Sequence, residues 1–113
     1  MGNMLMTKLK NKLKRIGDYE TNLSNINING RKVGCSGFVS NPKTKVVVYV
    51  NTEGIKWLGQ SHKNLVRFAK DTKDYGGAHS RNEWATDDEI EIKIARMLND
   101  EERYHRWLNK DCI

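Results

Sequence analysis

Cysteine and proline are scarce in this chain, which has two cysteines and one proline among 113 residues. Cys35 and Cys112 lie far apart with no third thiol between them, so we expect neither a disulfide scaffold nor a Cys-x-x-Cys motif. No apolar run is long enough to cross a bilayer, and the chain does not open on an apolar leader. We therefore expect a cytoplasmic protein with reduced thiols and no stable membrane insertion.

A catalytic or cofactor motif is also missing. His62, His79 and His105 share no metal-ligand spacing, and no nucleophile and base are placed together by a known pattern. We therefore predict no metal, no cofactor and no enzymatic activity.

Acidic residues are nearly absent from the first part of the chain. Residues 1–70 carry 13 Lys/Arg and only three acids, a net charge of +10, whereas residues 71–113 carry seven Lys/Arg and 11 acids, a net of −4. A field of one sign concentrated in part of a domain attracts polyanions, of which nucleic acid is the commonest.

The apolar spacing predicts a single α+β domain over residues 1–113. A basic amphipathic helix is expected over residues 1–17, because Leu5, Leu9, Leu13 and Ile16 form one stripe. A β-meander is expected over residues 20–52, with an Asn29-Gly30 hairpin turn. The prediction is a three-stranded antiparallel meander packed with helices.

Helices are expected for the rest of the chain, in the order α-β-β-β-α-α-α. Leu65, Phe68 and Ala69 recur at helical spacing, which predicts a helix over residues 61–75. Residues 86–111 are expected to form two acidic-to-mixed helices, the first opened by a Thr86–Glu89 capping box.

The predicted first helix is the leading candidate for a contact surface, because it carries five cations in eight residues and no acid. Three interpretations fit this pattern: contact with a polyanion, a solvated helix face, or adsorption to anionic lipid. With cations at the start of the second predicted helix, the expected nucleic-acid-binding residues are Lys8, Lys12, Arg15, Lys63, Arg67 and Lys70.

The segment Gly76–Asn82 is a candidate ligand loop, with Gly77, His79 and Arg81 as its chemically suited residues. An ordinary connecting loop is the alternative interpretation, and a small hydrolase or nuclease built around His79 is a second functional alternative.

In topology, residues 5–75 resemble a double-stranded RNA-binding domain: a helix, a three-stranded meander and a helix with basic residues at its opening. That family contacts A-form duplexes by shape, through its first helix, a strand loop and the start of its second helix.

The chain also resembles, in style, small accessory proteins of phages and plasmids, which are short, rich in Lys and Asn and poor in cysteine; anti-CRISPR proteins are one example. The resemblance implies an inhibitor of host defence machinery. We therefore expect a non-enzymatic protein that binds nucleic acid or a nucleoprotein complex through its basic half. The alternative is a protein-directed inhibitor or adaptor that uses the acidic C-terminal helices, and a homodimer is compatible with either.

Overall fold

The computed structural model describes residues 4–53, 63–76 and 80–110. Within these residues the chain forms a five-stranded antiparallel sheet and three helices, in the order α-β-β-β-β-β-α-α. The elements are α1 (Met6–Lys14), β1 (Glu20–Ile28), β2 (Arg31–Ser40), β3 (Val47–Asn51), β4 (Asn64–Phe68), β5 (Glu83–Ala85), α2 (Ile90–Asn99) and α3 (Glu101–Lys110). None of these helices is long and apolar enough to span a membrane.

The predicted three-stranded meander with four helices is therefore wrong, although the α+β composition is right. The expected helix over residues 61–75 contains strand β4, and strand β5 follows the candidate loop Gly76–Asn82 in a stretch where the sequence predicts no strand. The second helix on which the likeness to double-stranded RNA-binding domains depends is a strand in this chain.

The error arises because β4 is buried on both of its faces. All five of its residues are buried, so the strand does not show the apolar–polar alternation of a half-exposed strand. Val66 and Phe68 face the helices, whereas Leu65 and Arg67 point to the opposite side of the sheet. A continuous apolar run of this length fits a central strand as well as a helix.

The β1–β2 hairpin turns at Asn29 and Gly30, as the sequence predicts. Both residues have positive φ angles, 52° and 77°, as a type I′ turn requires. Each of the five strands pairs with the next one along the chain, so the sheet is a simple meander with β1 and β5 at its edges.

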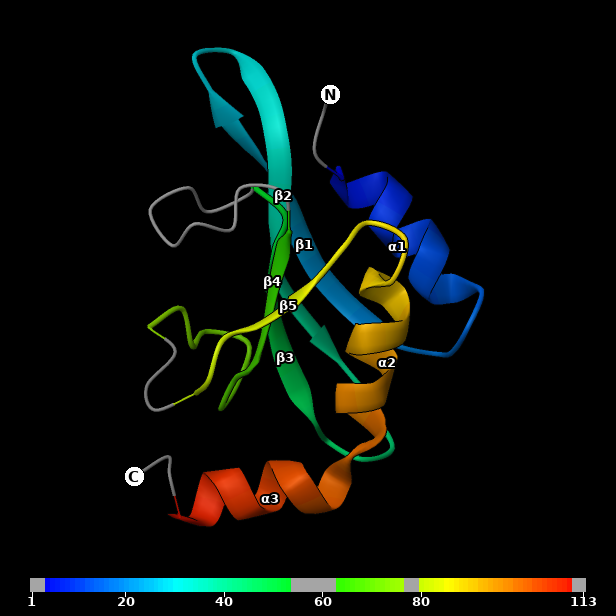
Figure 1. Ribbon diagram of the computed structural model, residues 1–113, viewed down its shortest axis with the longest axis vertical. Helices are drawn as coiled ribbons and strands as arrows, with labels where there is room; N and C mark the ends of the chain where they lie inside the picture. Colours follow the sequence, from blue (N-terminus) through cyan, green and yellow to red (C-terminus); the bar gives the residue numbers. More distant parts are fainter. Residues whose placement is uncertain (1–3, 54–62, 77–79, 111–113) are drawn as a thin grey trace.

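Helices α1 and α2 pack beside each other on one face of the sheet, and α3 continues from α2 across one end of it (Figure 1). Between helices and sheet lies the main core, to which Leu9, Val48, Val66 and Ile94 contribute fully buried side chains. A smaller apolar cluster of Phe38, Val47, Ala69 and Tyr49 covers part of the opposite face.

Helix α2 begins at Ile90, four residues later than the predicted capping box. Its N-cap residue, Glu89, makes no capping hydrogen bond with its side chain, so the prediction of a Thr86–Glu89 box is wrong. At the other end of α2, Asn41 Nδ2 and Thr44 Oγ1 of the β2–β3 turn donate to the carbonyl of Leu98, at 3.2 and 2.7 Å. The turn thereby satisfies a carbonyl that the helix end leaves without a partner.

Candidate functional site

The solvent-facing side of α1 carries the exposed cations of the predicted contact surface. Leu9 and Leu13 are buried against the sheet, which turns Lys8, Lys14 and Arg15 outward. A hollow of about 470 Å³ runs along this side, lined by Leu5, Thr7, Lys8, Asn11, Lys12 and Arg15. We call it the α1 hollow.

The start of α1 is fixed to the sheet by a side chain of β1. The Met6 amide donates to Asn25 Oδ1 at 2.9 Å, so one of the unsatisfied donors of the first helical turn has a partner. The Asn25 side chain lies on the face of the sheet that packs against the helices. Asn25 therefore helps to hold the basic helix in place.

Within the described residues, Lys12 is the cation of the α1 hollow that forms an ion pair with an acid of the C-terminal half. Its Nζ lies 3.2 Å from Glu91 Oε2 and donates to the carbonyl of Asp87 at 3.2 Å. Both side chains of the ion pair are less than one-fifth exposed. The opposed charges of the two halves therefore meet at this pair.

The remaining predicted cations are not gathered at one site. Lys63 is half-buried just before β4, and it does not line the α1 hollow. Lys70 is exposed. The residue before it, Ala69, accepts a hydrogen bond at 2.6 Å from Tyr104 Oη of α3, so Lys70 lies close to α3 and away from α1. Among the described residues, the predicted cations that share one hollow are Lys8, Lys12 and Arg15.

Arg67 lies in the interior of the fold and has only 4% of its surface exposed. Its guanidinium donates to the carbonyls of Asp74 and Tyr75 at 2.9 and 3.0 Å, and it stacks over the ring of Tyr49 at 4.4 Å. Burial lowers the pKa of Arg67, an effect that the nearby Asp74 carboxylate opposes. This guanidinium holds the segment after β4 against the sheet and is not presented to solvent.

Of the candidate ligand loop, Gly77 and His79 lie outside the described residues. Arg81 is exposed and lines a hollow of about 290 Å³ with Phe68, Ser80, Glu83, Arg103, Arg106 and Trp107. We call it the arginine hollow. Arg103 and Arg106 were not among the predicted site residues, although their three-residue spacing places them on neighbouring turns of one helix.

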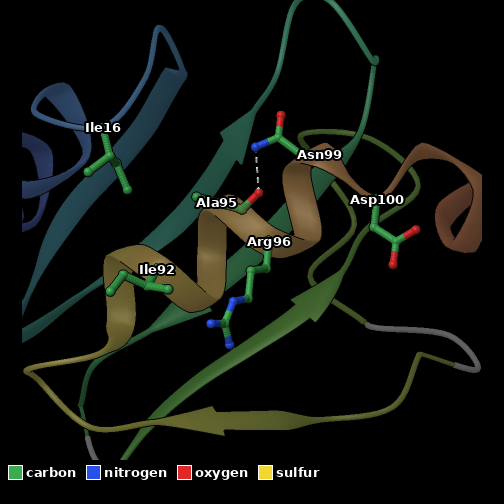
Figure 2. Close-up of a pocket in the computed structure, with 6 residues that line it drawn as sticks. All are labelled: Ile16, Ile92, Ala95, Arg96, Asn99 and Asp100. Atoms are coloured by element: carbon green, nitrogen blue, oxygen red, sulfur yellow. Dashed lines mark hydrogen bonds between the residues drawn. The ribbon is translucent and has the colours of Figure 1, made fainter.

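A third hollow, of about 650 Å³, lies between the end of α1 and helix α2. Figure 2 shows Ile92, Ala95, Arg96 and Asn99 along α2, with Asp100 just beyond it and Ile16 opposite. Ile16 and Ile92 are 43% and 48% exposed, which is high for isoleucine. We call it the α1–α2 hollow.

The described part of the chain contains one thiol, Cys35 on β2, and one imidazole, His105 on α3. Burial raises the pKa of the Cys35 thiol, and the Thr52 hydrogen bond offsets this only in part. His105 is exposed and lies 3.8 Å from Glu101. In the described part of the chain no group of three or more His, Cys, Asp or Glu residues is placed to hold a metal ion, and Cys112 lies outside it.

Comparison with known proteins gives no relative: no family model, no curated protein and no solved structure matches this chain.

Proposed function

We propose that this chain is a non-enzymatic binding protein that contacts nucleic acid, or a complex containing nucleic acid, through the exposed side of α1. The observation that carries the proposal is the convergence of Lys8 and Arg15 on one hollow, with Lys14 also exposed on the same helix. Among these three, no ion pair with an acid is formed within the described residues.

Lysine and arginine side chains on a rigid helix favour phosphate contacts that do not depend on base sequence. Each phosphate that they neutralise releases a condensed counterion, which provides the driving force for binding at low salt. The helix is held by buried Leu9 and Leu13 and by Asn25, so the backbone from which its cations extend is fixed against the sheet.

The proposed mechanism is occupancy. A protein docked on a duplex through α1 covers the backbone and excludes other proteins from it. The resemblance to accessory proteins of phages and plasmids favours a nucleoprotein complex of a host defence system as the target.

Charge reversal in the α1 hollow tests this proposal. The double variant Lys8→Glu/Arg15→Glu should weaken binding of a labelled duplex about tenfold or more, measured by fluorescence anisotropy at low salt. The matched control is Lys43→Glu/Lys45→Glu, which makes the same change of charge at the exposed β2–β3 turn. Equal loss of affinity in both variants, with both folded by circular dichroism, would refute the assignment to α1.

A protein-directed function is the second candidate, and the α1–α2 hollow is the observation that favours it. Exposed Ile16 and Ile92 offer an apolar contact, and the exposed acids Asp88 and Glu89 precede the same helix. A protein partner with an apolar side chain amid basic residues matches this surface. Such binding should survive nuclease treatment and be lost on Ile92→Asp, whereas binding through α1 should be unaffected by that substitution.

A further inference from the structure

The arginine hollow combines residues from three elements at the end of the molecule where α3 lies. Phe68 ends β4, Glu83 begins β5, and Arg103, Arg106 and Trp107 lie on α3. Helix α1 packs against β1, β2 and α2, and no residue of α1 lines this hollow, so it is separate from the α1 hollow.

Arg103 is held in a fixed orientation inside this hollow. Its guanidinium forms an ion pair with Glu83 and lies over the ring of Phe68, 4.9 Å from the ring centroid. Glu83 is in turn held by Lys93 at 2.6 Å, and the side chain of Glu83 is only 11% exposed. An arginine oriented in advance loses less conformational freedom when it binds a further anion.

Positive charge exceeds negative charge around the hollow. Three arginines line it with one carboxylate, and that carboxylate is shared between Lys93 and Arg103. Arg106 pairs with Glu102 at 2.9 Å, but this pair is exposed and therefore competes weakly with a bound anion. Arg81 is exposed beside them.

The floor of the hollow is aromatic but covered. Phe68 and Trp107 are 4% and 7% exposed and stack on each other with ring centroids 5.8 Å apart. Their faces are therefore engaged within the fold and offer no platform for a base. Recognition must come from the guanidinium groups, whose planar donors suit phosphate oxygens.

We propose that the arginine hollow is a second anion site that binds a phosphate group, with Arg103 as the fixed donor and Arg81 and Arg106 as the closing cations. This site goes beyond the proposed function, because it does not use α1. The phosphate belongs either to a small ligand or to a nucleic-acid backbone, and both have the same chemistry at the hollow.

Calorimetric titration of the full chain with pyrophosphate tests the site. Wild-type protein should bind it saturably at one site, and Arg81→Gln/Arg106→Gln should weaken this binding about tenfold for each lost contact. The control Arg31→Gln/Lys32→Gln removes two cations at the exposed tip of the β1–β2 hairpin and should leave affinity within about twofold. The proposal would be overturned if wild-type protein showed no saturable binding of pyrophosphate. It would also be overturned if the arginine variant and the control variant lost affinity equally.

A competing oligonucleotide distinguishes the two sources of phosphate. Displacement of pyrophosphate by a short duplex in the Lys8→Glu/Arg15→Glu background assigns the hollow to a nucleic-acid backbone, and no displacement assigns it to a small phosphate ligand. That background lacks the α1 contacts. The result at the arginine hollow therefore does not depend on whether α1 binds nucleic acid. Arg103→Lys, which keeps the charge but loses the planar donors, should also weaken binding in either case.

Discussion

Arg67 and Lys8 have the same formal charge but opposite environments in the fold. Arg67 donates to backbone carbonyls and packs on Tyr49 inside the structure, whereas Lys8 is exposed on α1. Residue type alone does not distinguish these roles, because the position of a strand in the sheet decides which cation is covered. The predicted contact at Arg67 therefore has no support from its position, and Lys8 and Arg15 retain theirs.

Glu83 makes the stability of the fold dependent on pH. Its burial alone would raise its pKa, but hydrogen bonds and charges from Lys93 and Arg103 outweigh burial and lower the pKa below the usual 4.5. A carboxylate with a lowered folded-state pKa stabilises the fold above its unfolded-state pKa, and this contribution is lost as pH falls through the folded-state value. We expect Glu83→Gln to lower the free energy of unfolding at neutral pH by about 1–2 kcal/mol.

Urea unfolding of both proteins over a series of pH values checks this expectation. The difference between wild type and Glu83→Gln should shrink as the pH falls below 4.5. A difference that stays constant through the acidic range would mean that Glu83 is not held as an ion by its two partners.

At the scale of elements, local patterns predicted some features well and others not at all. The stripe of Leu9 and Leu13 placed α1, and Asn29-Gly30 placed the first hairpin turn. Strand β4 could not be recognised, because its burial on both faces depends on the segment that Arg67 pins across the sheet. The start of α2 was predicted wrongly for a similar reason. Asp87 and Glu91 contact Asn64 and Lys12, which are distant in sequence.

Gly37 is the element-scale position where a single methyl group should disrupt the sheet. It has a φ of 144°, and a Cβ there would overlap the carbonyl oxygen of Asn22 and lie 2.9 Å from Leu23 Cα on strand β1. We expect Gly37→Ala to lower the free energy of unfolding by more than about 2 kcal/mol.

The control is Gly76→Ala, where a Cβ meets nothing within 4 Å and the backbone is not left-handed. Thermal denaturation should show a clearly lower melting temperature for Gly37→Ala and almost no change for Gly76→Ala. Equal melting temperatures for the two would show that β1 moves away from β2 at no cost.

At the scale of the whole molecule, the charge asymmetry of the sequence survives folding only in part. Glu91 neutralises Lys12, while Lys8, Lys14 and Arg15 remain exposed. The sequence indicated the basic helix, but not which cation an acid of the other half would cover. The arginine hollow was also beyond prediction, because it needs β4, β5 and α3 to meet.

Removing the carboxylate of Glu91 should release Lys12 for binding. We expect Glu91→Gln to raise affinity for a labelled duplex about twofold to threefold and to lower the free energy of unfolding by about 0.5–1 kcal/mol. The control Glu101→Gln makes the same change of net charge on exposed α3. Equal gains in both variants would attribute the effect to net charge instead of Lys12.

The dependence of duplex binding on salt concentration tests the central claim most directly. Plotted logarithmically, the association constant of wild-type protein should fall with a slope of about −3, since about three exposed cations of α1 each replace counterions. The slope of Lys8→Glu/Arg15→Glu should be shallower by about 2. A wild-type affinity that does not change with salt, or a slope that the double variant leaves unaltered, would contradict binding through α1.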